Sequence, residues 1–481
     1  MVTGGGEVRP VRQVFHVLLL LVATVVVAIG LSGLLGRLLQ PPDLLDTGSA
    51  ALARNVTFTV IGLPLLAGLL LWVARLLRAD ADERRSPGWA VLTGVTGVTA
   101  LVVTMVAGYG VLSWALGLAH YDGRALAQLL VWGTLLAAVR VVEARVLPAG
   151  HAVPHRVVAA LVGLGTSAVA LATLLATAVE QLAGPLAREP LLAAGADPVL
   201  AALAALVVGA VGWGLSWWPV RRDGGVLWLL YVLLTGVAAG LLTALTAASV
   251  LLYDVLVWLV GDPAESSAAG HFTEVEGQLS AVVVGLLLWW YHHAVLEAAG
   301  EPGRTEVRRV YEYLMAAVGL LVASAGLATV LVAGIEALAR GRELVVTGGA
   351  VNTLLAALTM LAVGGPVWWL YQGRTRRAVG REPAEAGAAE DHVGRAAAAE
   401  AAELASPTRR TYLLLIVGVS TVAVVVALLV AVFLLLEDAF EGRFGAETLR
   451  QARFALAALV TTGLVAGYHW RVYGRDRAAR W

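Results

Sequence analysis

The sequence predicts an all-α integral membrane protein in which about twelve transmembrane helices form six helical hairpins. The chain of 481 residues is 59% hydrophobic and only 14% charged, whereas soluble domains carry roughly 25% charged residues. Apolar runs such as 14–36 and 310–335 exceed the roughly 20 residues that cross a hydrocarbon core. Short motifs also recur at the ends of these runs, which indicates a repeated structural unit.

The predicted helices follow one another with short connections. In chain order the apolar segments lie near 14–36, 56–77, 89–119, 125–142, 156–183, 199–218, 226–259, 277–295, 310–338, 349–371, 411–437 and 449–470. The first is too long for a cleaved signal peptide and has no small-x-small cleavage site, so we expect it to remain as a helix. The segment 125–142 is the weakest prediction, because Arg140 lies near its end and its loss would reverse the orientation of every later helix.

The distribution of arginine predicts the orientation. All 34 basic residues are arginine, and placing the N-terminus inside puts 25 of them on the inner side and nine outside. The 34 acidic residues divide evenly, 17 to each side. Only the cations are distributed unevenly between the two sides, as the positive-inside rule predicts. We therefore expect both termini in the cytoplasm and the chain in a bacterial cytoplasmic membrane.

Motifs at the inner helix ends define the repeat. Outgoing helices open with arginine shortly before an aromatic residue, as in Val11-Arg-Gln-Val-Phe15, Val307-Arg-Arg-Val-Tyr311 and Thr408-Arg-Arg-Thr-Tyr412. Returning helices end with paired aromatic residues, as in Trp217-Trp218, Trp289-Trp290, Trp368-Trp369 and His469-Trp470. Every copy has the same in-to-out sense. The hairpins are therefore parallel repeats, unlike the inverted repeats of many secondary transporters.

With these motifs the chain resembles an uncharacterised bacterial membrane family, found in actinobacteria and chloroflexi and catalogued only as a domain of unknown function. The resemblance is clearest over 301–481, and it implies that two hairpins make one domain. Three domains are then expected, at 1–150, 151–300 and 301–481, with a cytoplasmic Ala/Glu-rich linker at 380–406 in the third. The resemblance implies no activity, ligand or catalytic residue.

Composition excludes much chemistry. The chain has no cysteine and no lysine, which rules out thiolate and Schiff-base chemistry and the phosphate-loop lysine. Its charged residues gather at the predicted helix ends, whereas proton or ion coupling usually needs them deep in the bilayer. We therefore predict no catalytic, cofactor-binding or metal-binding residues, no cofactor and no enzyme activity.

Four local patterns each have a functional and a structural interpretation. The Trp-Trp pairs suit an aromatic cage, but their common depth favours interfacial anchors. His292-His293 and His469 are interpreted as interfacial polar residues rather than metal ligands. The loop with Asp262, Glu265, His271, Glu274 and Glu276 suits a divalent cation or a solvated acidic loop. Gly163-Leu-Gly-Thr-Ser-Ala168 matches a dinucleotide fingerprint by letter, but it and Gly236–Gly240 are expected to serve close helix contact.

Three classes of function remain open. A structural or interaction role in the membrane is favoured, a transporter or permease for a weakly polar small solute is the alternative, and an intramembrane enzyme comes third. The expected partners are the bilayer with its anionic headgroups and either a second copy or another membrane protein joined through helices. No nucleic-acid partner is expected.

Overall fold

The computed structural model of the chain is all-helical over the residues it describes, which are 8–41, 49–79, 83–148, 150–182, 197–221, 225–298, 306–340, 348–377, 379 and 400–479. All twelve predicted segments form helices. Eleven helical stretches in this described part are long and apolar enough to cross a membrane, and the predicted segment 125–142 is one of them. The chain is therefore a multi-pass membrane protein.

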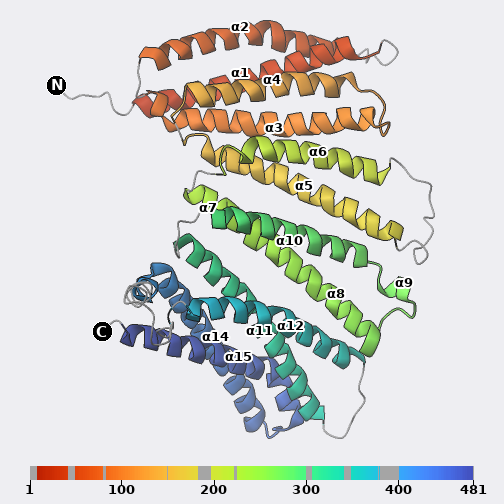
Figure 1. Cartoon of the computed structure of the whole chain (residues 1–481), viewed down its shortest axis with the longest axis vertical. Helices are drawn as coiled ribbons and strands as arrows, with labels where there is room; N and C mark the ends of the chain where they lie inside the picture. Colours follow the sequence, from red (N-terminus) through yellow and green to blue (C-terminus); the bar gives the residue numbers. More distant parts are fainter. Residues whose placement is uncertain are drawn as a thin grey trace, which may run out of the picture. The chain divides into compact units, whose positions relative to one another are not determined.

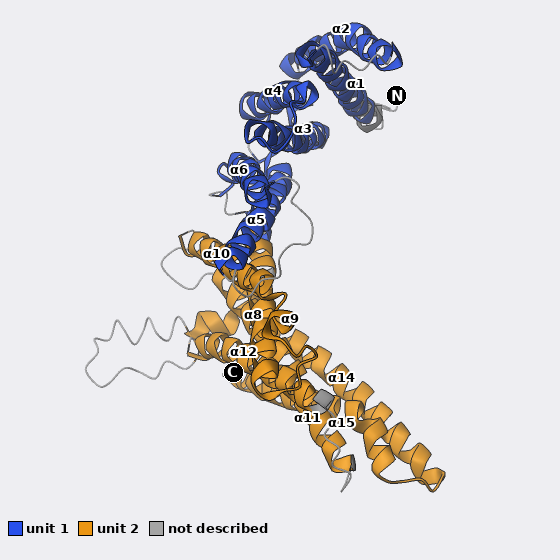
Figure 2. Ribbon diagram, turned by 90° about the vertical axis from the view of Figure 1, so that its right-hand side faces the viewer, with its two compact units in different colours: residues 1–231 blue, residues 232–481 orange. Residues whose placement is uncertain are grey.

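The described helices follow the predicted segments within a few residues. Two compact units contain them, residues 1–231 and 232–481 (Figure 2). The division into three domains stays a prediction about sequence repeats. The helices of residues 1–231 (Figure 1) are α1 Val8–Leu39, α2 Ser49–Ala79, α3 Pro87–Ala115, α4 Gly123–Arg145, α5 Val153–Leu182 and α6 Pro198–Trp217, with a short 3₁₀ turn η2 at Glu83–Arg85 before α3 and α7 Val226–Val232 at the boundary between the units.

In residues 232–481 the chain continues as the π-helix η3 Leu233–Leu241, then α8 Leu242–Val260, the short α9 Ala268–His271 and α10 Val275–Ala298. The remaining helices are α11 Glu306–Arg340, α12 Gly348–Arg377, α14 Pro407–Phe440 and α15 Ala446–Ala478. The twelfth predicted span, α15, is a full-length helix but is not among the eleven. Its arginines at both ends lower its hydropathy.

Helix starts in this chain have clear local causes. Ser86-Pro87, Asp197-Pro198 and Ser406-Pro407 each place a capping side chain before a proline at the first helical position. The capping oxygen accepts a backbone N–H that has no partner inside the helix, and proline lacks the N–H that would be left unbonded there. These three junctions therefore fix where α3, α6 and α14 begin.

Antiparallel helix pairs are the packing unit. The closest pairs are α1 with α2, α3 with α4, α5 with α6, α8 and η3 with α10, α11 with α12, and α14 with α15. Within the first unit α1 also packs on α4, and α3 packs on α5 and α6; within the second, α11 packs on α15 and α12 on α8. Each predicted hairpin therefore exists as a contacting pair of helices.

Candidate functional site

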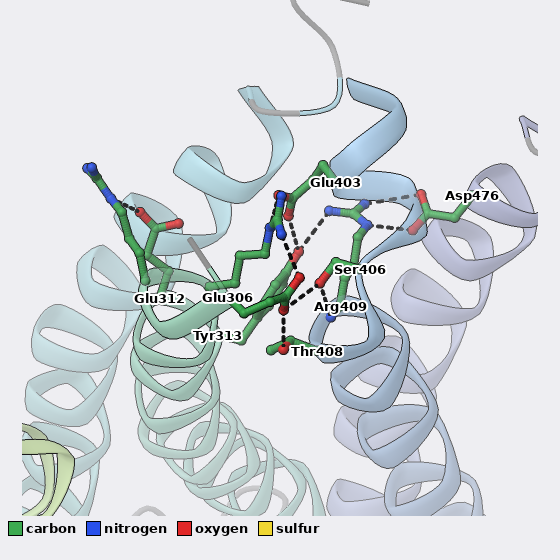
Figure 3. A network of polar contacts seen from close by, with 10 residues as sticks. Glu306, Glu312, Tyr313, Glu403, Ser406, Thr408, Arg409 and Asp476 are labelled. Carbon is green, nitrogen blue, oxygen red and sulfur yellow. Dashed lines mark hydrogen bonds and ion pairs between the residues drawn. The ribbon is translucent and has the colours of Figure 1, made fainter. Parts of the chain in front are cut away.

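The most elaborate polar site in the described part of the chain lies where α11, α14 and α15 meet. Figure 3 draws it, and we call it the ionic cluster: Glu306, Arg308, Arg309, Glu312, Tyr313, Glu403, Ser406, Thr408, Arg409 and Asp476. Charged side chains are rarely buried unless they are paired. Here Glu403 is 1% exposed and Arg409 is 4% exposed. The arrangement therefore requires nearly complete pairing.

Arg409 joins three helices. Its Nε and Nη2 donate to the two carboxylate oxygens of Asp476 on α15, at 2.6 and 3.1 Å. Its Nη1 donates to the hydroxyl of Tyr313 on α11 at 3.0 Å. A two-point arginine–carboxylate pair of this kind has fixed geometry as well as charge attraction. Arg409 therefore holds the first turn of α14 against α11 and α15.

Glu403 occupies the centre of the cluster. Its two oxygens accept from Arg309 Nε at 2.7 Å and from the Tyr313 hydroxyl at 3.0 Å. Residues 400–405 are helical, with Glu403 and Leu404 buried. The end of the predicted linker 380–406 is thus packed into the bundle, while residues 380–399 lie outside the described residues.

Glu306 closes the exposed side of the cluster. It accepts from Arg309 Nη1 at 2.5 Å, from Thr408 at 2.7 Å and from Ser406 at 3.1 Å. Burial raises the pKa of Glu306, but the hydrogen bonds from Thr408, Arg309 and Ser406 outweigh that effect and hold its pKa below the ordinary value. The carboxylate is therefore stabilised in its charged form.

A second buried carboxylate, Glu143, also joins helices through ion pairs, in residues 1–231. The side chain of Glu143 at the end of α4 is 1% exposed. It pairs with Arg140 at 3.3 Å, with His155 Nε2 at 2.5 Å and with Arg156 Nη2 at 2.8 Å. Arg140 also donates to Ser216 on α6 at 3.4 Å. These contacts join α4, α5 and α6 at one end.

The paired aromatic residues at the ends of returning helices divide between two environments. The second member is exposed in each case: Trp218, Trp290, Trp369 and Trp470 are 63–68% exposed. The first member faces protein, with Trp217 stacked on Tyr231 and Trp289 donating to the Tyr311 hydroxyl at 2.7 Å. Interfacial anchoring therefore fits only the second residue of each pair.

The structure shows on which side of their helices the histidines and the opening arginines lie. His292 and His469 are 1% and 0% exposed, so both face the protein interior, and their interfacial depth stays a prediction. Of the opening arginines, Arg309 and Arg409 point into the ionic cluster while Arg410 is exposed. The side chain of Arg12, in the first copy, lies outside the described residues. The position of a residue in the sequence predicts its depth in the membrane, but it does not predict the side of the helix on which these histidines and arginines lie.

The glycine-rich segments serve close helix contact, as predicted. A Cβ added to Gly163 would collide with the backbone nitrogen of Trp213, so α5 and α6 touch backbone to backbone there. At Gly240 the added Cβ would lie 2.8 Å from the backbone nitrogen of Trp289. Small residues permit this approach in membrane bundles.

The loop at 262–276 brings together no group of three His, Asp or Glu side chains that could hold a metal ion, and none is found elsewhere among the described residues. Instead His271 Nε2 lies 2.9 Å from the carbonyl oxygen of Asp254, and Gln278 donates to the Asp254 carboxylate at 2.9 Å. These contacts join the loop to α8 and α10. They give His271 a structural role, which is to hold the loop against α8.

Two cavities open in the bundle of α1 to α4. One, of about 700 Å³, is lined by polar residues near the α1–α2 and α3–α4 connections, including Ser32, Asn55 and Gln128. The other, of about 510 Å³, lies toward the opposite ends of these helices and has mainly apolar walls. By position along the helices, the packed residues Ala28, Ala100, Leu101 and Leu136 lie between them.

Sequence reasoning did not identify the ionic cluster, the Glu143 site or either cavity. The signal for both charged sites was present, since Glu143 and Glu403 each lie near arginines at helix ends. Chemically, both sites are sets of paired acids and bases. Such sets hold helices together.

Comparison with known proteins identifies a family and nothing more specific. No curated protein and no solved structure matches the chain at a significant level. The family described as domain of unknown function DUF5671 matches residues 13–141 and 309–464, which together make up more than half of the chain. The chain therefore belongs to the DUF5671 family of domains of unknown function.

Proposed function

We propose that this protein has a structural or interaction role in the bacterial cytoplasmic membrane and catalyses no reaction of its own. The observation that carries the proposal is the placement of buried charge. Glu143, Glu403, Arg409 and Asp476 lie near helix ends and are paired with one another or with neighbouring cations. Charges used for coupling are usually kept deep in the bilayer. Paired charges at helix ends favour a rigid bundle.

The proposal includes an orientation with both termini in the cytoplasm. The split of 25 arginines against nine supports it. Trp218 and Trp369 are exposed a few residues before arginines of this set, which supports headgroup depth for these helix ends. In this orientation the ionic cluster lies at the cytoplasmic ends of α11, α14 and α15.

The proposed partners are anionic headgroups and membrane helices, without nucleic acid. Long apolar faces remain exposed on the described helices, for example Val419, Val422 and Val426 on α14. In the membrane such faces contact lipid or the helices of another protein. Association with a second copy or another membrane protein is the interaction that we propose for them.

Deletion and complementation test the structural role. The gene is deleted in its native bacterium, and envelope permeability is measured together with the metabolites of cells and medium. A structural role predicts an envelope defect that an Asp476→Ala variant fails to correct, with metabolite levels unchanged. A selective change in one solute, with a normal envelope, would contradict the proposal.

Transport of a weakly polar small solute is the second candidate. It is favoured by the two cavities at opposite ends of α1 to α4, separated by a short packed layer. Ala51 lines the polar cavity, so Ala51→Phe fills it without replacing any of its charged residues. If this variant folds normally but fails to complement the deletion, transport is favoured. Full complementation favours the structural role.

A further inference from the structure

The cavity of about 510 Å³ in residues 1–231 has an apolar wall and a basic mouth. Its wall is built from α1 to α4 and, apart from three threonines, its deep part is apolar, with Leu20, Leu66, Leu70, Val73, Leu92 and Val139 among the lining residues. Its volume lies within the range of cavities that bind organic ligands. An apolar wall of this kind suits a hydrocarbon chain rather than a soluble solute.

Arg78, Arg84 and Arg145 provide all the charged residues of the lining. They come from the end of α2, from η2 and from the end of α4. Among the described residues none of the three forms an ion pair, and Arg84 only donates its Nε to the carbonyl oxygen of Leu77 at 2.6 Å. The nearby carboxylate of Glu143 is already paired with Arg140, His155 and Arg156. The described lining of the mouth therefore carries three arginines and no carboxylate.

The depth of the cavity matches one leaflet. From Arg78 at the mouth to Leu66 in the wall is 12 positions of α2, or about 18 Å at 1.5 Å per residue. Half of a hydrocarbon core is about 15 Å. A molecule with its charge at the arginines and an extended chain along α2 would thus span this leaflet.

We propose that this cavity binds an anionic phospholipid, with its phosphate at Arg78, Arg84 and Arg145 and one acyl chain between α2, α3 and α4. Guanidinium groups suit phosphate, because they donate two parallel hydrogen bonds to it. A neutral lipid leaves the three cations uncompensated. A free anion leaves the apolar wall unfilled. The inference goes beyond the structural role proposed above and does not depend on it.

Native mass spectrometry of the full chain tests the proposal. Protein released from vesicles of equal parts phosphatidylglycerol and phosphatidylcholine should retain one phosphatidylglycerol. In the triple variant Arg78→Gln, Arg84→Gln, Arg145→Gln the fraction of protein that retains phosphatidylglycerol should fall at least about tenfold, because each cation near the surface adds attraction for anionic lipid. Arg75→Gln is the matched control, because Arg75 lies on the same end of α2 but outside the lining.

A second pair of variants tests the acyl chain without changing charge. Ala138 lines the cavity and its neighbour Ala137 does not. Ala138→Phe should lower phosphatidylglycerol retention as strongly as the arginine variant, and Ala137→Phe should leave it unchanged. The single variant Arg145→Gln, at an exposed position, serves if the triple variant does not fold. Equal retention of phosphatidylcholine, or wild-type retention in Ala138→Phe and Arg145→Gln, would overturn the proposal. Neither outcome bears on the envelope phenotype.

Discussion

Arg409 and Asp476 form a two-point ion pair between the first turn of α14 and the last turns of α15, with both side chains about 95% buried. The pair lies 67 residues apart in sequence. It joins the start of α14 to the end of α15, at the open end of the last hairpin, where no loop connects the two helices. Because the Tyr313 hydroxyl accepts from the same guanidinium, α11 is held at the same point.

Removing one partner of this pair should destabilise the protein strongly. Asp476→Ala leaves the Arg409 guanidinium buried without its counterion, which typically costs about 3–5 kcal/mol. The measurement is the free energy of unfolding in mixed micelles, with Arg410→Gln, at the exposed position next to Arg409, as the control. The double variant Arg409→Met, Asp476→Leu should recover much of the loss, because burial of the charge is removed. A single variant as stable as the control would contradict this account.

Acid should loosen the ionic cluster through Glu306. Its pKa is held below 4.5 in the folded protein, so its contribution to stability is present above that value and is lost as pH falls through the lowered folded pKa. Glu306→Gln should therefore be less stable than the wild type near pH 6, and the difference should shrink in strong acid. Melting temperatures from pH 6 to pH 3 measure this. A difference that grows on acidification would show that the sign is wrong.

Neighbouring glycines of α5 should respond differently to alanine. At Gly163 the added methyl group would collide with the backbone of Trp213, whereas at Gly165 there is open space. Gly163→Ala should cost about 1–3 kcal/mol as an overpacked contact. Gly165→Ala should be neutral or stabilising, because alanine favours helix by up to about 1 kcal/mol. Unfolding free energies of the two variants compare them directly, and equal values would mean that α5 and α6 separate easily.

Topology reporters should place three positions on one side of the membrane. Fusions after Gly150, Gly300 and Trp481 should all fluoresce with a cytoplasmic reporter and lack alkaline phosphatase activity, because all three follow returning helices in the arginine-based orientation. An active phosphatase at any one of them would contradict the twelve-span arrangement. The fusion after Gly150 also tests whether α4 crosses the membrane.

The sequence predicted the helices well because crossing a bilayer requires long apolar runs that are easy to detect. It did not predict the π-helix at Leu233–Leu241, which packs against α10. The sequence places Glu403 in the Ala/Glu-rich linker 380–406, because alanine and glutamate surround it. Only the approach of Arg309 and Tyr313, 94 and 90 residues away, makes it an interior residue.

The same limit applies to the cavities. Arg78, Arg84 and Arg145 read as members of an inner arginine belt, and nothing in the spacing indicates that they surround one opening. Their convergence depends on how α2 and α4 both pack against α1, which hydropathy does not encode. Depth in the membrane is thus readable from sequence, whereas the neighbours of a residue at that depth are not.

The split aromatic pairs also fix how each returning helix is turned about its own axis. Successive residues of a helix point about 100° apart. Rolling α10 by one residue would therefore bring Trp290 into the bundle and carry Trp289 away from the Tyr311 hydroxyl. Trp290 would lose its lipid contact and Trp289 would lose its hydrogen bond, so both residues oppose this rotation. Two adjacent side chains thereby set the azimuth of the helix, a quantity that hydrophobicity alone leaves free.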